Sequence, residues 1–186
     1  MKTAVVIIGV PGTGKSTLMR QIMGELDILT GETDGKFFKE GLVIGHTFGG
    51  VIVFGDYQNP DEVFPGLDRA SMAIMPEFKQ FIEKKQPQKI LLEGDRLGSL
   101  STIEFLLKEG YDLMIMILEA DPSIVEERYK KRGSNQTDTF LNAKHTKVNN
   151  IRLNLDLQMD GYIFEVKNNT QEDLQENTQK VLAFLK

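Results

Sequence analysis

The sequence predicts an α/β fold with a parallel sheet of about five strands and helices on both faces of the sheet. Strand-like and helix-like segments alternate along the chain, and the strand-like segments are apolar throughout instead of alternating with polar residues. Helices cover both faces of a parallel sheet, so uninterrupted apolar runs are typical of its strands. Because no linker, repeat or low-complexity tract interrupts the 186 residues, we expect a single domain over residues 1–186.

The first strand-like run, Val5–Ile8, leads directly into a glycine-rich turn and a helix. Residues 9–17 read G-V-P-G-T-G-K-S-T, which is the G-x-x-x-x-G-K-S spacing of a phosphate-binding loop. Glycines in such a loop let backbone N–H groups point at phosphate oxygens, and the helix that follows begins with its positive dipole end at the anion. The residues predicted to bind the nucleotide are Gly9, Gly12, Thr13, Gly14, Lys15, Ser16 and Thr17, with Lys15 also catalytic and Ser16 also a ligand of Mg²⁺.

Further strands are predicted where β-branched and aromatic residues gather between turn-forming residues. They are expected at 42–47, 51–54, 89–93, 113–118 and 162–166. The first two are separated only by Phe48-Gly49-Gly50, which predicts a hairpin. Residues 30–39, rich in glycine and charge, are expected to form a surface loop.

Helices are predicted where apolar residues recur three and four positions apart. After the helix that begins at Lys15, they are expected at 68–85, 100–109, 122–132, 137–155 and 170–185. Asp68 and Asp121 are predicted N-caps, and Thr170 with Asp173 has the spacing of a capping box.

Acidic residues follow several of the predicted strands: Asp56, Glu93 with Asp95, and Glu119. The carboxyl ends of parallel strands meet at one edge of the sheet, and ligands bind there. An acid at that edge can reach Mg²⁺ or accept the proton of an attacking hydroxyl. Asp95 is the first candidate for the base, Glu93 the second and Asp68 the third. Glu93 can instead orient the water shell of Mg²⁺, and Asp68 can be only a helix cap.

Basic residues concentrate between Arg128 and Arg152. The whole chain has a net charge of −5, but this stretch has seven basic residues against one acid, a local excess of +6. Such segregation marks either a polyanion-binding surface or a solvated helix face. The predicted catalytic arginines here are Arg128 and Arg132. The predicted substrate-binding residues are Asp56, Asp68, Arg69, Arg96, Lys144 and Lys147, although Arg69 and Arg96 can also be members of structural ion pairs.

The order of these elements resembles the nucleotide and polynucleotide kinases of the P-loop superfamily, as do the phosphate loop, the Glu93-Gly-Asp95-Arg96 turn and the Arg128-Tyr-Lys-Lys-Arg132 segment. In such kinases an acid after the third strand activates the acceptor hydroxyl, and arginines of a helical lid close on the phosphoryl group. The resemblance therefore implies ATP and Mg²⁺ as cofactors, Asp95 or Glu93 as the base, and a lid over about 128–152.

Two further stretches, 64–72 and 133–151, look similar to phage-type kinases that phosphorylate 5-hydroxymethyluracil in DNA. This closer resemblance implies a modified pyrimidine in DNA as the acceptor. The predicted hairpin at 42–54 departs from thymidylate and adenylate kinases, which also favours an acceptor other than a mononucleotide. A small-molecule nucleoside or nucleoside monophosphate kinase and a P-loop NTPase that is not a kinase stay open as alternatives.

The sequence also predicts where the protein works. It has no cysteine, which fits a reducing compartment, and no apolar run approaches the roughly 20 residues that span a bilayer. Residues 1–3 lead directly into the first strand, which leaves no room for a signal peptide. We therefore expect a soluble cytoplasmic protein without a membrane partner, located in the host cytoplasm if a phage encodes it.

Overall fold

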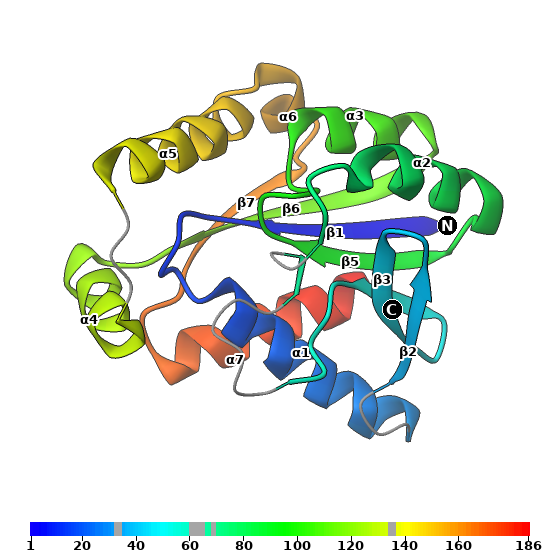
Figure 1. The fold of residues 1–186 in the computed structure, drawn as a ribbon, viewed down its shortest axis with the longest axis horizontal. Coiled ribbons are helices and arrows are strands. Elements are labelled where there is room, and N and C mark those ends of the chain that lie inside the picture. Colours follow the sequence, from blue (N-terminus) through cyan, green and yellow to red (C-terminus); the bar gives the residue numbers. More distant parts are fainter. Residues whose placement is uncertain (32–34, 60–65, 68–69, 134–136) are drawn as a thin grey trace.

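A seven-stranded sheet forms the centre of the molecule, in the order β2-β3-β4-β5-β1-β6-β7 (Figure 1). The computed structural model describes all residues except 32–34, 60–65, 68–69 and 134–136. The side chain of Arg132 also lies outside the description. Five strands run parallel: β1 (Lys2–Ile8), β4 (Val51–Phe54), β5 (Lys89–Glu93), β6 (Tyr111–Glu119) and β7 (Ile163–Lys167). The strands β2 (Lys36–Glu40) and β3 (Val43–Phe48) extend the sheet in antiparallel fashion.

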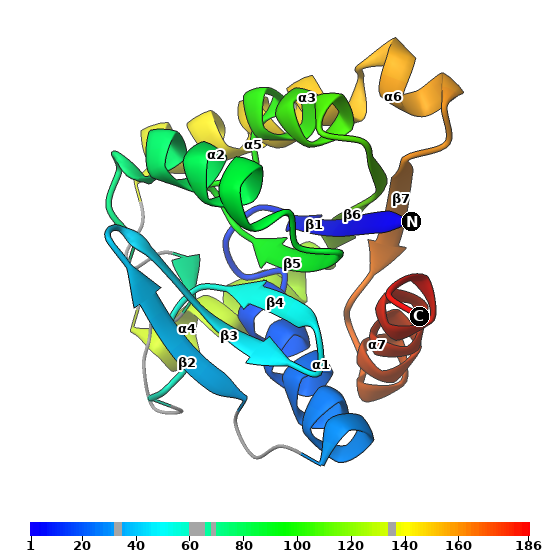
Figure 2. The same cartoon turned by 90° about the vertical axis from the view of Figure 1, so that its right-hand side faces the viewer.

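Helices cover both faces of this sheet (Figure 2). On one face lie α1 (Lys15–Thr30) and α7 (Gln171–Phe184), and on the other lie α2 (Ile74–Lys85), α3 (Leu100–Lys108), α5 (Asp138–Arg152) and the short α6 (Leu155–Met159). The remaining described helix, α4 (Pro122–Arg132), lies beyond the end of β6 (Figure 1). None of the described helices is long and apolar enough to cross a membrane.

Strand β1 explains why the central strands are apolar throughout. It pairs with β5 on one side and β6 on the other, and its residues alternate between two separate cores. Ala4 and Val6 pack under α2 and α3, whereas Val5 and Ile7 pack against α1 and α7, and all four are fully buried. The end of β1 therefore emerges in the middle of the carboxyl edge, with a strand on each side.

The five parallel strands and the hairpin confirm the predicted fold class, but the prediction of about five strands was too small. Residues 36–40, expected as part of a loop, form β2 and pair with β3. Most of this edge strand is exposed, so its sequence lacks an apolar run. The ring of Phe38, which stacks on Phe81 of α2 with centroids 5.5 Å apart, fixes β2 against the rest of the fold.

Two predicted helix boundaries also change. Helix α2 begins at Ile74 and not at 68, because Pro76 is tolerated in the first turn but would break a helix that began six residues earlier. Asp68 itself lies outside the described residues. Helix α5 ends at Arg152, and Asn154 caps the separate helix α6 by accepting a hydrogen bond from the Leu157 N–H.

Two predicted caps differ in outcome. The capping box of Thr170 and Asp173 is confirmed at the start of α7. Asp121 occupies the N-cap position of α4, but its side chain makes no capping hydrogen bond. Its carboxylate pairs instead with Lys167, 3.2 Å away.

We expect Phe54→Ala to lower the free energy of unfolding by about 3–5 kcal/mol, because it opens a cavity where Phe54 packs edge-on against Phe78 and Phe81. Urea denaturation measures this change. Phe164→Ala is the matched control, since this ring is 40% exposed and its loss should cost less than about 1 kcal/mol. Equal losses in the two variants would contradict the core position of Phe54.

Candidate active site

The glycine-rich loop joins β1 to α1 at the middle of the carboxyl edge. Gly14 is the N-cap of α1 with φ of 92°, and as a glycine it has no side chain to cover the start of the helix. The first backbone N–H groups of α1 therefore face the space above the loop, where an anion is stabilised by the helix dipole. The predicted sequence of strand, phosphate loop and helix is confirmed.

Side chains hold the carbonyl groups of this loop from Gly9 to Thr13. Lys15 Nζ donates to the carbonyls of Gly9 (2.9 Å) and Val10 (3.2 Å), and Thr13 Oγ1 also donates to Val10 (2.9 Å). The next three carbonyls are bound by residues far away in sequence: Pro11 by Tyr129 OH (2.9 Å), Gly12 by Arg128 Nη1 (3.0 Å) and Thr13 by Asn168 Nδ2 (2.8 Å). These contacts fix the direction of each peptide group in an otherwise flexible segment.

Helix α4 packs directly on the loop at Gly12. A Cβ at this position would lie 2.9 Å from Val125 Cγ1 and 3.0 Å from Tyr129 Cε1, and φ at Gly12 is 84°. Both the backbone conformation and the close approach of α4 therefore require glycine. Arg128, a predicted catalytic residue, lies against the same loop and also donates to the Asn168 carbonyl at 2.8 Å. The side chain of Arg132, the second predicted arginine, lies outside the described residues.

Ser16 and Glu93, the two predicted magnesium residues, lie side by side. Ser16 Oγ donates to Glu93 Oε1 at 3.1 Å, and Tyr57 OH donates to the same oxygen at 3.0 Å. Glu93 ends β5, next to β1, and is only 4% exposed. A hydroxyl and a carboxylate oxygen in contact beside a phosphate loop form an oxygen donor set that fits Mg²⁺.

A second cluster forms around Asp95, just after β5. Lys144 of α5 pairs with Asp95 Oδ2, and Lys147 of the same helix donates to the Asp95 backbone carbonyl. Burial lowers the pKa of Lys147, and the nearby charge of Arg96 lowers it further. The fold thus brings together four predicted site residues, Asp95, Arg96, Lys144 and Lys147, from segments that are far apart in sequence.

The other predicted substrate-binding residues are placed differently. The backbone of Asp56 forms an antiparallel bridge with Gly66. Each N–H donates to the carbonyl of the other residue, at 3.2 and 2.6 Å. Its carboxylate accepts a hydrogen bond from the Gln58 N–H at 3.1 Å, which stabilises the turn after β4. Asp68 and Arg69 lie outside the described residues.

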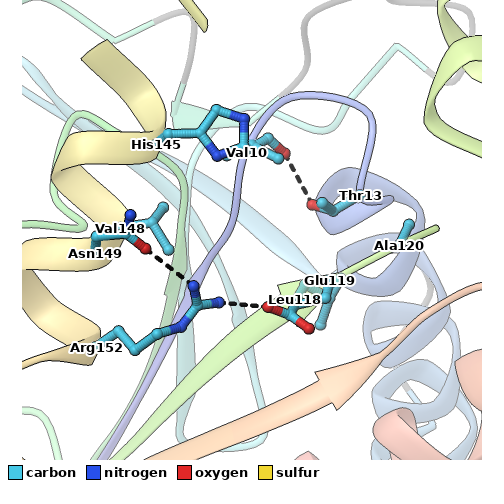
Figure 3. A pocket seen from close by; sticks show the side chains of 9 residues that line it. All are labelled: Val10, Thr13, Leu118, Glu119, Ala120, His145, Val148, Asn149 and Arg152. Carbon is cyan, nitrogen blue, oxygen red and sulfur yellow. Dashed lines mark hydrogen bonds and ion pairs between the residues drawn. The ribbon is translucent and has the colours of Figure 1, made fainter. Parts of the chain in front are cut away.

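A cavity of about 260 Å³ lies between the loop and α5 (Figure 3). The loop contributes Val10 and Thr13, and the α5 wall includes His145 and Arg152. Arg152 is held by Glu119 at the end of β6 (2.5 Å) and by Glu165 of β7 (2.9 Å). This cavity opens onto the same carboxyl edge as the phosphate loop and has a polar, charged wall.

A second cavity, of about 240 Å³, lies on the opposite flank of the loop. It is lined by Gly14, Thr17, Arg128, Asn168, Asn169, Thr170, Gln171 and Leu174. Its walls combine the start of α1, the guanidinium of Arg128 and the segment between β7 and α7.

The basic stretch between Arg128 and Arg152 is largely neutralised. Lys130 and Lys131 form ion pairs of 2.7 and 2.6 Å with Glu126 and Glu127, which lie just before the stretch. Lys144 pairs with Asp95, and Arg152 pairs with Glu119 and Glu165. The local charge excess therefore does not create an open basic surface among these residues.

Sequence reasoning missed Tyr129 and Asn168. Asn168 directly follows β7, so the rule that ligand-binding residues follow parallel strands pointed to it, but only acids were sought there. Asn168 is 3% exposed, and its Oδ1 is buried without a hydrogen-bond partner among the described residues. No sequence signal identifies Tyr129, because its partner Pro11 becomes a neighbour only in the folded chain.

The fold and the site together define a P-loop nucleotide-binding protein: a phosphate loop after the central strand and an acid at the end of the neighbouring strand. A family model, P-loop nucleotide kinase 3, matches residues 1–183. The chain belongs to this family, and it is therefore a P-loop kinase. No curated protein sequence matches the chain.

Two solved structures share its fold. A gluconokinase from Sinorhizobium meliloti 1021 aligns over 99% of this chain and 91% of its own, with 15% identity and a TM-score of 0.51. An unliganded sugar kinase from Janibacter sp. HTCC2649 aligns over 99% and 96%, also with 15% identity and a TM-score of 0.51. At this identity the likeness concerns the fold alone.

We expect Gly12→Ala to weaken nucleotide binding at least about tenfold and to lower the free energy of unfolding by about 1–3 kcal/mol, because its Cβ pushes α4 off the loop. Titration calorimetry with ADP and urea denaturation measure the two effects. Gly50→Ala is the matched control: its φ is 96° and its Cβ meets nothing within 4 Å. If Gly50→Ala weakened ADP binding equally, the collision with α4 would not be the cause.

Proposed function

We propose that the protein is an ATP-dependent kinase that transfers the γ-phosphoryl group to a hydroxyl of a small molecule. The observation that carries this proposal is the meeting of two sets of side chains at one edge of the sheet. Ser16 and Glu93 adjoin the phosphate loop, and Asp95 with Lys144 lies two residues further along the same strand end. A nucleotide site beside a separate polar cluster is what transfer between two substrates requires.

The nucleotide half of the site follows from the loop. Lys15 and the N–H groups of the loop hold the phosphates, and the cavity next to Arg128 and Asn168 accepts the nucleoside. Ser16 would hold Mg²⁺, with Glu93 orienting it through water, and the ion would neutralise charge on the phosphates when bound. Arg128 and Arg132 remain the candidates for stabilising the transferring phosphoryl group.

The acceptor half centres on Asp95. Its side chain is 27% exposed, whereas Glu93 is nearly buried and already accepts two hydrogen bonds, so Asp95 is the better base for an incoming hydroxyl. An acceptor that engages Asp95 replaces its contact with Lys144. Arg96, Lys144 and Lys147 then surround a position where an acidic group of the acceptor is stabilised. The gluconokinase and sugar kinase folds among the structural neighbours support a small acceptor of this kind.

A DNA acceptor carrying 5-hydroxymethyluracil is the second candidate. The stretches 64–72 and 133–151 favour it by their resemblance to phage-type DNA kinases, although part of both lies outside the described residues. The ion pairs of Lys130, Lys131 and Arg152 weigh against it, since they reduce the charge available to a DNA backbone. Membership of a kinase family disfavours the third alternative, an NTPase without an acceptor.

Incubation with γ-labelled ATP and separate acceptors tests the proposal. The panel contains nucleosides, nucleoside monophosphates, sugars and sugar acids, and DNA with and without 5-hydroxymethyluracil. We expect label on a small molecule. Lys15→Ala should lower this labelling at least about 100-fold, because it removes the phosphate-binding charge, and should keep the fold. Label on DNA alone would favour the second candidate, and release of phosphate without any labelled acceptor would overturn the kinase proposal.

We expect Asp95→Asn to lower kcat by about 100-fold or more and to change the KM for ATP less than about threefold, because the residue acts on the acceptor hydroxyl. Steady-state kinetics on the acceptor found in the panel measures both constants. Asp112→Asn, at the amino end of β6, is the matched control and should retain normal kinetics. If ATP affinity alone collapsed in Asp95→Asn, the base role would pass to Glu93.

A further inference from the structure

Tyr129 and Asn168, like Arg128, lie outside the phosphate-loop motif and hold peptide groups of the motif itself. Tyr129, on α4, donates its hydroxyl to the Pro11 carbonyl at 2.9 Å, across 118 positions of the sequence. Asn168, just after β7, donates Nδ2 to the Thr13 carbonyl at 2.8 Å, across 155 positions. The motif therefore receives part of its geometry from two later segments of the chain.

The consequence for anion binding follows from peptide geometry. The structure has no cis peptide bond among the described residues, and in a trans peptide the C=O and the N–H point in opposite directions. A carbonyl of Pro11 held outward by Tyr129 turns the Gly12 N–H inward, and a carbonyl of Thr13 held by Asn168 does the same for Gly14. Glycine permits both orientations of such a peptide, so without these donors the loop would sample both.

We infer that Tyr129 and Asn168 are positioning residues of the phosphate site, which pre-orient the N–H groups of Gly12 and Gly14 for phosphate oxygens. The inference rests on the proposed nucleotide-binding function. Through Tyr129, the position of α4 also sets the affinity for the phosphates. Pre-orientation matters because an aligned N–H binds the anion without the cost of ordering the loop first.

The alternative is that Tyr129 only packs. Its ring lies against Gly12, where a Cβ would come within 3.0 Å of Cε1. Tyr129→Phe keeps this ring contact and deletes only the hydroxyl, so it separates positioning from packing. Tyr162→Phe deletes a hydroxyl just before β7, in a residue that packs partly buried against the other core, and is the matched control.

Titration calorimetry with ADP and with adenosine tests the inference. Tyr129→Phe should weaken ADP binding by about 3- to 10-fold, the effect of one lost hydrogen bond, and leave adenosine binding within about twofold. The KM for ATP should rise by the same factor with little change in kcat, because phosphate contacts act on ground state and transition state alike. Tyr162→Phe should match the wild type in every measurement.

Asn168→Asp provides a second variant, since it replaces the donor to Thr13 by an acceptor of the same shape. It should weaken ADP binding more than Tyr129→Phe, again with a smaller effect on adenosine. Unchanged ADP binding in Tyr129→Phe, or equal losses for ADP and adenosine, would overturn the inference while the proposed function stands. Failure of the wild-type protein to bind ADP would overturn both.

Discussion

The pairing of β1 with β5 and β6 is the constraint on which the site depends. Because β1 is buried on both faces and on both edges, its end cannot move independently of the sheet. The pairing also fixes β5 and β6 relative to β1, because Ile7 lies opposite Glu93 of β5 and Met116 of β6. The start of the phosphate loop, the backbone of Glu93 and the end of β6 are therefore fixed relative to one another by the sheet.

Polar contacts surround this rigid edge, in addition to the core packing of Val148 and Ile151 of α5. Helix α4 is attached to the loop mainly through Arg128 and Tyr129, and α5 reaches the end of β5 through Lys144 and Lys147. Hydrogen bonds and partly exposed ion pairs exchange with water more readily than buried apolar contacts do, so these contacts of α4 and α5 open more easily than the core does. A rigid sheet edge with exchangeable polar contacts around it suits a reaction that must admit two substrates and exclude water.

The sequence was sufficient for the parts of the fold that depend on local pattern. The central strands, the hairpin and the phosphate loop could be predicted because apolar runs and glycine spacing are read directly from neighbours in the chain. Strand β2 could not, since it is a short edge strand and most of its residues are exposed. The start of α2 was predicted too early. The helical spacing of apolar residues continues on both sides of Pro76, but the helical backbone begins only at Ile74.

Some features of the site could likewise be predicted from the sequence, and others could not. The meeting of Ser16 with Glu93 was predicted, because the ends of parallel strands lie along one edge. The partners of Asp95 on α5 were named as substrate-binding residues, but their contact with Asp95 depends on how α5 crosses that edge. The charge excess at 128–152 left a polyanion-binding surface and a solvated helix face as alternatives. Glu126 and Glu127 lie outside the counted stretch and pair with Lys130 and Lys131 one helical turn away.

The contacts of the loop carbonyls imply that the phosphate-loop motif is not a self-contained module. Residues 9–17 supply donors for the carbonyls of Gly9 and Val10, but those of Pro11, Gly12 and Thr13 are bound by α4 and by the segment after β7. If the motif were transplanted onto another strand and helix, it would keep Lys15 and Ser16. It would lose the donors to the carbonyls of Pro11, Gly12 and Thr13. A minimal nucleotide binder built from this chain needs the helix at 122–132 and Asn168 as much as it needs the glycines.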